Sequence, residues 1–459
     1  MKTGWEKKVT IAIWLIIFTL DLFRILFYGD LRLSIGNPDT PSYIRSSRND
    51  LFSWQIFAGE RMFSTNLLYK LAVGDADCPL TSFSMPGIGQ ETKRKLQPCF
   101  DLIVVFQNLL SVISWSFLAY TAARWVRHPL SKITLISLVL IFGFTPQVAE
   151  WDSNLGPESI TVSVFILLLA FLLQIAHRFI YNRDRFYSQS NLILIFASLI
   201  VYVFWIFIRD AHLYTIGITL LLLLPLLLDS EHREKKIFPV ICLLLMGVFV
   251  LGYKSAKDSL RATYYPVTNS FYFYIAPYPA RLQFFQQRGM PELDSPGLQR
   301  WMDDHLAGTF GKFLLNHPGF VLSTLVEYRD YFSSDYLQPY YKIAGSQIHE
   351  FLILLGEFVH PESLAIFLID FIIILGLTLA AVRLRQRETY ALAWLGSWFI
   401  LCSAVTLFIT FFGDVAGTRR HIYPSVEMFR LFLWIYLCIM LDTYIIFSSY
   451  HEEIKELPA

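Results

Sequence analysis

Apolar residues occur along this chain in long continuous runs and not in the stripes of an amphipathic helix. A run of about 20 residues is long enough to cross the hydrocarbon core of a bilayer as a helix. The pattern therefore predicts about ten membrane-spanning helices. They are expected at Val9–Phe27, Phe100–Ala123, Ile133–Thr145, Ile160–Ile180, Leu192–Ile208, Leu213–Leu228, Ile237–Tyr253, Ser363–Val382, Thr389–Phe412 and Met428–Phe447.

Composition supports the same class. Hydrophobic residues make up 55% of the 459 residues, charged residues only 16%, and the mean hydropathy is +0.47. A soluble domain carries about 25% charged residues. We therefore expect an all-α polytopic membrane protein with one membrane domain over residues 1–459. The formal net charge of +1 comes with no basic face, which excludes nucleic acid as a partner.

Lysine and arginine predict the orientation, because short cytoplasmic connections are enriched in them. Every second connection is basic, which places both termini in the cytoplasm. The opening stretch "MKTGWEKKVTIAIWLIIFTL" is then an uncleaved signal anchor. Two long loops, 28–99 and 254–362, fall on the outer face. The basic residues are Lys2, Lys7, Lys8, Arg124, Arg127, Lys132, Arg178, Arg183, Arg185, Arg233, Lys235, Lys236, Arg383, Arg385 and Arg387.

The second long loop is expected to carry interfacial helices. In "GTFGKFLLNHPGFVLSTLVEYRDYF" the apolar residues recur at spacings of three and four, which predicts an amphipathic helix on the membrane surface. Glu350–Phe358 is apolar but too short to span, so it is re-entrant or interfacial.

The five cysteines separate into two groups. Cys242, Cys402 and Cys438 lie in apolar runs and are expected to be small core residues. Cys78 and Cys99 lie in the first outer loop, where an oxidising compartment would permit a disulfide between them; two free thiols are the alternative.

The stretch "SIGNPDTPSYIRSSR" contains Asp39, which follows Pro38 and precedes Pro41 by two residues. Prolines predict a stiff, extended turn. The low dielectric at the mouth of a helix bundle is expected to raise the pKa of the Asp39 carboxyl toward that of a general base. Tyr43 follows as a candidate substrate contact. The structural alternative is a turn or a helix cap.

Three further outer connections carry polar residues. Charged side chains at membrane depth are expensive and commonly face a partner or a polar cavity. Arginine forks match phosphate oxygens in a bidentate way. The structural alternatives are acids that complement a helix dipole, an Arg209–Asp210 pair, and arginines on lipid headgroups. The candidates are Asp152 and Glu158 in "AEWDSNLGPESI", Arg209, Asp210 and His212 in "IFIRDAHLYTIG", and Arg419, Arg420 and His421 in "GDVAGTRRHIYPSVEMF".

With these pieces in place, the chain resembles the C-type integral-membrane glycosyltransferases. The resemblance lies in the first-loop acid in "NPDTPSY", two long outer loops, "NHPGFVL" in the second of them, and "RRHIYPS" before the last span. It implies a polyprenyl-phosphate-linked sugar donor and transfer outside the cytoplasm, with Asp39 as catalytic base. Many members carry two acids in this loop, whereas Asp39 stands alone.

We therefore expect a glycosyltransferase of the bacterial inner or plasma membrane that moves a sugar to a lipid, glycan or protein at the outer face. A surface-polysaccharide polymerase or ligase, a lipid or solute transporter or flippase, and a structural envelope subunit are the alternatives. No cofactor is needed if arginines neutralise the phosphate. A divalent ion held by Asp39 with Glu150, Asp152 and Glu158 is the alternative to this metal-free site.

Overall fold

The computed structural model describes residues 4–28, 34–37, 39–73, 98–181, 187–228, 236–261, 266–337 and 346–455. Within these ranges the regular structure is helical, with one isolated parallel bridge between Ile35 and Asn154. This confirms the all-α class. Pro38 and Cys78 lie outside the described residues, so the Cys78–Cys99 disulfide stays a prediction.

The predicted apolar runs correspond to long helices. Nine helices in the described ranges are long and apolar enough to cross a membrane. A tenth crossing is formed if α5 and the following short helices, bent by 48° at Thr145, count as one broken span. The long helices are α1 (Gly4–Tyr28), α4 (Asp101–Ala122), α5 (Pro129–Phe144), α7 (Glu158–Tyr181), α8 (Gln189–Ile206), α9 (Thr215–Leu228), α11 (Ile237–Asp258), α20 (Ala365–Leu384), α21 (Arg387–Gly413) and α22 (Thr418–Lys455).

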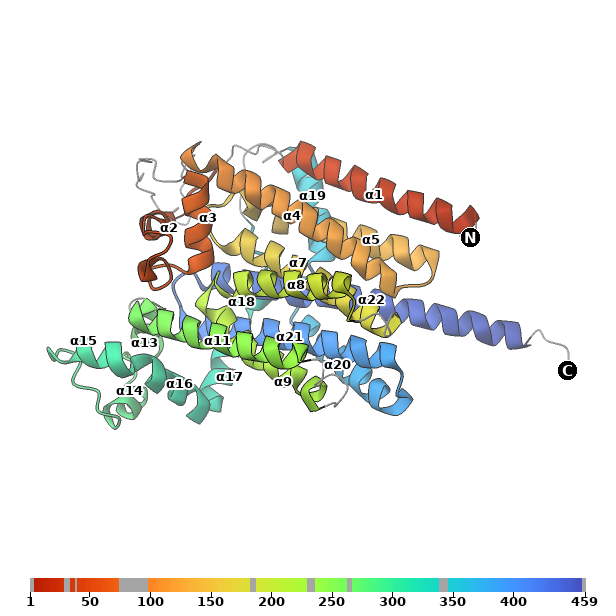
Figure 1. The fold of residues 1–459 in the computed structure, drawn as a ribbon. Coiled ribbons are helices and arrows are strands. Elements are labelled where there is room, and N and C mark those ends of the chain that lie inside the picture. Colours follow the sequence, from red (N-terminus) through yellow and green to blue (C-terminus); the bar gives the residue numbers. More distant parts are fainter. Residues whose placement is uncertain are drawn as a thin grey trace.

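Shorter helices connect the spans. Figure 1 shows that α2, α3 and α13 to α16 gather at the end of the bundle opposite to where α1 begins and α22 ends. The short elements are α2 (Thr40–Ser47), η1 (Trp54–Ile56), α3 (Phe63–Val73), η2 (Pro98–Phe100), η3 (Ala123–Trp125), α6 (Pro146–Ala149), η4 (Glu150–Ser153), η6 (Asp210–Tyr214), α13 (Pro266–Tyr274), α14 (Pro279–Gln286), α15 (Leu298–Trp301), η7 (Met302–Leu306), α16 (Ala307–Asn316), α17 (Pro318–Glu327), α18 (Asp330–Ser333) and α19 (Gln347–Val359).

The main core surrounds α7, which is the most enclosed of the spans. Helix α7 packs closely against α4, and α4 also packs against α5. At the second contact, Gly143 of α5 lies against the Trp115 ring of α4. A Cβ at Gly143 would come within 2.3 Å of that ring, so only glycine permits the approach. This packing fixes the depth of α7 and of the acidic residue at its first position, Glu158.

A second, aromatic core lies in the second long loop. It does not form the single amphipathic helix that the periodicity predicts, because the chain breaks at His317 and restarts with Pro318 in the first turn of α17. Its helices pack on the α21–α22 junction. Buried members from both sides are Phe271, Tyr274, Phe285, Phe310, Phe313, Phe332, Phe411, Phe412, Ile422 and Val426. We call this unit, α13 to α18, the aromatic cap.

Helix α19 contains the short apolar segment Glu350–Phe358. Its exposed side is a row of large apolar side chains, whereas His349 is buried and its Nε2 lies 2.7 Å from Oε1 of Glu150. The exposed row comprises Ile348, Phe351, Leu354 and Phe358. A 13-residue helix of this kind is too short to span and fits an interfacial location.

Candidate functional site

Five charged side chains from four distant segments meet at one end of the bundle. We call them the arginine cluster: Asp39, Arg61, Glu158, Arg209 and Arg420. Nη2 of Arg61 donates to Oδ1 of Asp39 at 2.9 Å, and Nη2 of Arg420 donates to its Oδ2. Nη2 of Arg209 donates to Oε1 of Glu158 at 2.7 Å, and Nε of Arg420 lies 3.4 Å from the same oxygen. Arg420 therefore bridges the two carboxylates.

Asp39 is the residue immediately before helix α2, with helical backbone angles of φ −86° and ψ −18°. The flanking prolines Pro38 and Pro41 predict an extended turn instead. A helix forms because Pro41 stands in its first turn, where no backbone N–H is needed. The carboxylate makes no cap hydrogen bond, and the Asp39 N–H donates to Oδ1 of Asn37 at 2.8 Å. The side chain is thus left to face the arginines.

Arg61 comes from the first long loop and is not among the residues that the sequence pattern predicts for the site. Its Nε donates to Oγ of Ser42 at 2.6 Å, and its guanidinium lies 4.5 Å from the centre of the Tyr43 ring. Tyr43 therefore holds Arg61 against Asp39 by a cation–π contact. Because positive-inside counting treats long-loop arginines as uninformative, the pattern gave no signal for Arg61.

Arg209 and Asp210 face opposite directions. The backbone of Arg209 is extended, with φ −143° and ψ 141°, so successive side chains alternate. Arg209 reaches Glu158 and the His421 carbonyl, whereas Asp210 accepts two hydrogen bonds of 3.1 Å from Arg261. Arg261 also donates to the Gly59 carbonyl at 3.0 Å. Asp210 thus anchors the loop before Arg61 and does not join the cluster.

His421 and Asp414 lie at the edge of the cluster, in the α21–α22 junction. Nδ1 of His421 is 3.6 Å from Oδ2 of Asp414, and its Nε2 is 3.0 Å from Nη2 of Arg420. Gly417, at φ +73°, has the left-handed backbone that makes this tight junction. Asp414 was not foreseen, because it follows an apolar run as an ordinary turn residue would.

The electrostatics differ from the expectation for Asp39. Burial favours a raised pKa, but the guanidinium of Arg420, and then that of Arg61, outweigh it and lower the pKa of the Asp39 carboxyl to about 2. Its side chain is 30% exposed, whereas that of Glu158 is 1% exposed. Asp39 is therefore an ionised carboxylate at the surface of the cluster, whereas Glu158 is a carboxylate buried beneath the arginines.

Three other predicted residues have partners outside the cluster. Asp152 pairs with Arg24 and accepts from Oγ of Ser159 at 2.5 Å. His212 stacks on Trp205, with 3.9 Å between ring centres, and its Nδ1 is 2.8 Å from that residue's carbonyl. Arg419 points to the aromatic cap, donating to Oγ of Ser334 and the carbonyl of Asp335. In the structure, the three side chains therefore contact other parts of the protein and not the arginine cluster.

The candidate metal group does not come together. Glu150 faces His349 and Asp152 faces Arg24, while Asp39 and Glu158 are engaged by arginines. Within the described ranges no three His, Cys, Asp or Glu side chains are placed to hold one metal ion. The described residues therefore do not fit a metal site.

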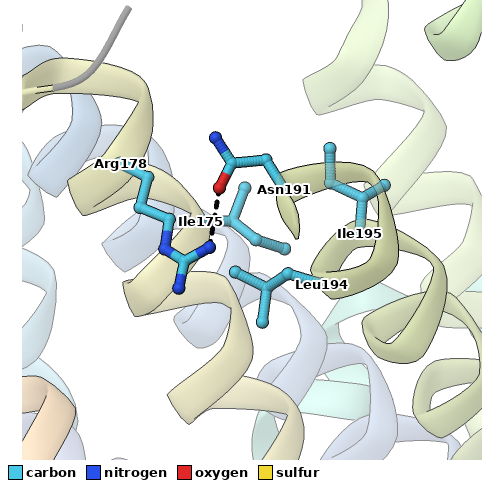
Figure 2. A pocket seen from close by; sticks show the side chains of 5 residues that line it. All are labelled: Ile175, Arg178, Asn191, Leu194 and Ile195. Carbon is cyan, nitrogen blue, oxygen red and sulfur yellow. Dashed lines mark hydrogen bonds between the residues drawn. The ribbon is translucent and has the colours of Figure 1, made fainter. Parts of the chain in front are cut away.

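Figure 2 shows a hollow between α7 and α8, where Nη1 of Arg178 donates to Oδ1 of Asn191 at 2.7 Å. Ile175, Leu194 and Ile195 complete its lining. Arg178 lies near the last turn of α7 and Glu158 in its first, so the length of the helix separates this hollow from the cluster. The hollow holds no reactive pair.

Gly156 is the close-approach position behind the cluster. A Cβ there would lie 2.2 Å from Oε2 of Glu158 and 2.7 Å from Nδ2 of Asn37. Gly156→Ala is expected to push Glu158 off Arg209 and lower the thermal unfolding midpoint, since overpacking costs about 1–3 kcal/mol. Gly376→Ala, where nothing lies within 4 Å, is the control. Equal midpoints for the two variants would contradict the close approach.

Of the comparisons with known proteins, only the one with solved structures finds matches. No family model matches the chain, and no curated protein matches it. The archaeal oligosaccharyltransferase AglB from Archaeoglobus fulgidus, in complex with an inhibitory peptide and a dolichol-phosphate, is 12% identical, with a TM-score of 0.43. That comparison covers 99% of this chain and 52% of the other.

Two more structures of the oligosaccharyltransferase from Archaeoglobus fulgidus match at 14% identity and a TM-score of 0.41. The apo form is matched over 99% of this chain and 52% of that one, and the complex with Zn and sulfate over 95% and 51%. The chain spans about half the length of these proteins. It is similar to them in outline only.

Proposed function

We propose that the protein is a membrane glycosyltransferase that moves a sugar from a polyprenyl-phosphate donor to an acceptor outside the cytoplasm. The observation that carries this proposal is the convergence of Arg61, Arg209 and Arg420 on the carboxylates of Asp39 and Glu158. Guanidinium forks bind phosphate as they bind carboxylate. An anionic ligand can therefore replace Asp39 at this site.

The location of the cluster favours a lipid-linked donor. It lies where α7 and α22 begin, at the end of a membrane bundle, with the aromatic cap packed on the same junction. A phosphate held there would keep its isoprenoid chain beside apolar helices and its sugar beside the polar loops. The basic connections at the opposite end support an extracytoplasmic site, in a bacterial inner or plasma membrane, with loops 28–99 and 254–362 outside.

The chemistry follows from an exchange of partners at Arg420. The donor phosphate takes the Arg420 fork and releases one oxygen of Asp39, whose carboxylate stays ionised at neutral pH because Arg61 still donates to its other oxygen. An acceptor oxygen then attacks the anomeric carbon as the bond to the phosphate oxygen breaks. Arg209 and Arg420 neutralise the charge that grows on the leaving phosphate, and the Asp39 carboxylate faces the positive charge that develops on the sugar.

The phosphate site is tested with farnesyl phosphate as the probe. The full chain in nanodiscs is expected to bind it, and to release it from at least one farnesyl-phosphate-linked glucose, galactose, mannose or arabinose as the sugar passes to water. Arg420→Lys keeps the charge but loses the bidentate fork, so binding measured by calorimetry should weaken by about tenfold or more. Arg209→Lys should weaken it similarly.

Arg45→Lys is the matched control, because Arg45 forms an exposed pair with Glu60 in the same loop as Asp39. It should bind farnesyl phosphate as the wild type does. Normal binding by both the Arg209 and the Arg420 variants would contradict the phosphate assignment. A wild-type protein that neither binds the probe nor consumes a donor would contradict the proposed function.

A further inference from the structure

The two ring nitrogens of His421 face groups of opposite character. Nε2 lies 3.0 Å from Nη2 of Arg420, and Nδ1 lies 3.6 Å from Oδ2 of Asp414. A guanidinium nitrogen can only donate, so Nε2 has to accept. The one proton of the neutral ring is then on Nδ1, facing a carboxylate. The imidazole therefore presents a basic lone pair toward the guanidinium that holds Asp39.

Asp414 is itself fixed in place. Its Oδ1 accepts from the backbone N–H of Ala416 at 2.9 Å and from Nδ2 of Asn269 at 3.4 Å, which leaves Oδ2 for the imidazole. The side chains of His421 and Asp414 are 18% and 20% exposed, so a ligand at the cluster can reach them. A carboxylate beside Nδ1 orients the ring and favours the imidazolium that forms when Nε2 takes a proton.

Charged groups approach His421 from every element packed around it. Arg420 on α22, Arg209 before η6 and Arg61 of the first long loop are positive, whereas Asp39 before α2 and Asp414 after α21 are negative. A donor phosphate on Arg420 takes over the Nη2 hydrogens and adds negative charge beside the ring. Nε2 is then released from its donor at the moment when the reaction needs a proton acceptor.

We propose that His421 is the general base of the transfer and that Asp414 is the residue that positions its ring; this inference rests on the proposed function. The acceptor hydroxyl oxygen forms a bond to the anomeric carbon while its proton passes to Nε2. The bond between that carbon and the donor's phosphate oxygen breaks, and its electron pair leaves on the lipid phosphate. The proton is later released to water.

The assignment also separates two roles that a single carboxylate would otherwise combine. Asp39 keeps its ion pair with Arg61 after the donor takes Arg420, so its carboxylate is a weak base that remains a strong electrostatic partner for the sugar. The Nε2 lone pair of His421 points to the arginine that binds the donor, and an imidazole in this orientation can take a proton from the acceptor oxygen. Both groups contact the same arginine, so they can act on one substrate.

The test uses the full chain in nanodiscs and the farnesyl-phosphate sugar that the wild type consumes fastest, with release of farnesyl phosphate as the readout. His421→Gln keeps a polar atom near Nε2, and His421→Asn keeps one near Nδ1, but neither is a base. Both should bind farnesyl phosphate within threefold of wild type and turn over at least about 100-fold more slowly. Imidazole added to His421→Ala should restore part of the rate.

The pH profile distinguishes positioning from folding. Asp414→Asn should lower the rate about tenfold and move the acid limb of the profile to lower pH, because the imidazolium loses its counter-charge. Near-normal turnover by both His421 variants, with the wild type active, would overturn this assignment and leave the proposed function intact. Absence of both binding and turnover in the wild type would overturn the two together.

Discussion

Asp39→Asn is expected to fold normally, to bind farnesyl phosphate at least as tightly as the wild type, and to transfer sugar at least about 100-fold more slowly. Binding should not weaken because the Asp39 carboxylate competes with phosphate for the Arg420 fork. Turnover should fall because the amide has the same shape but no charge to place opposite the developing positive charge on the sugar. Calorimetry and donor consumption measure the two effects separately.

Asp50→Asn is the control for this prediction, since Asp50 is exposed in the same loop. The acid limb of the pH–rate profile shows whether Asp39 acts through its charge or as the base. If Asp39 acts only through its charge, Asp39→Asn keeps an acid limb, which moves to lower pH because a negative charge that favours the His421 imidazolium is lost, and the rate loss persists at neutral pH. A limb that disappears in Asp39→Asn, with the His421 variants near normal, would make Asp39 the base that the sequence analysis expected.

Glu158→Gln is expected to lower stability by about 3 kcal/mol or more, since removal of one partner leaves buried charges uncompensated. Glu158 is 1% exposed on its side chain and is the common partner of Arg209 and Arg420, whose side chains are 12% and 15% exposed. The thermal unfolding midpoint of the nanodisc-embedded chain, followed by tryptophan fluorescence, measures the loss.

Two companion variants show whether charge is the cause. Glu158→Gln combined with Arg209→Gln removes one charge of each sign and should recover part of the midpoint. Glu60→Gln breaks the exposed pair with Arg45 and should change the midpoint little. A double variant less stable than Glu158→Gln alone would assign the effect to lost packing.

The spans could be predicted because each one needs about 20 apolar residues, and that length is visible without knowing what packs against it. Arg209 and Arg420 could be selected for a related reason: a cation between apolar runs is costly unless it has a partner. Which partner each finds is a property of the packed bundle. Asp152 looked equivalent to Glu158, yet one faces Arg24 and the other faces Arg209.

The site residues in the loops could not be predicted, for a different reason. Arg61 and Asp414 are ordinary loop residues by composition, and only the contacts with Asp39 and His421 distinguish them. The low pKa of Asp39 depends on the same contacts, so an expectation from dielectric alone had the wrong sign. A buried network elsewhere in the bundle joins Glu427 to Nδ1 of His360 at 2.5 Å and to Nη1 of Arg430 at 2.7 Å. A Glu–Arg pair three residues apart in an apolar run is a signal from which the sequence could have predicted part of it.

The aromatic cap has a consequence for motion. Phe411 and Phe412 end α21 and Ile422 and Val426 begin α22, and all four are buried in the cap's core, on either side of the junction that carries Asp414 and His421. Residues that share one core open together, as one cooperative unit. Amide hydrogens in the junction should therefore exchange with deuterium at the same rate as the amide hydrogens of α13 and α16. Heating that loosens the cap would then abolish turnover well before the membrane helices separate.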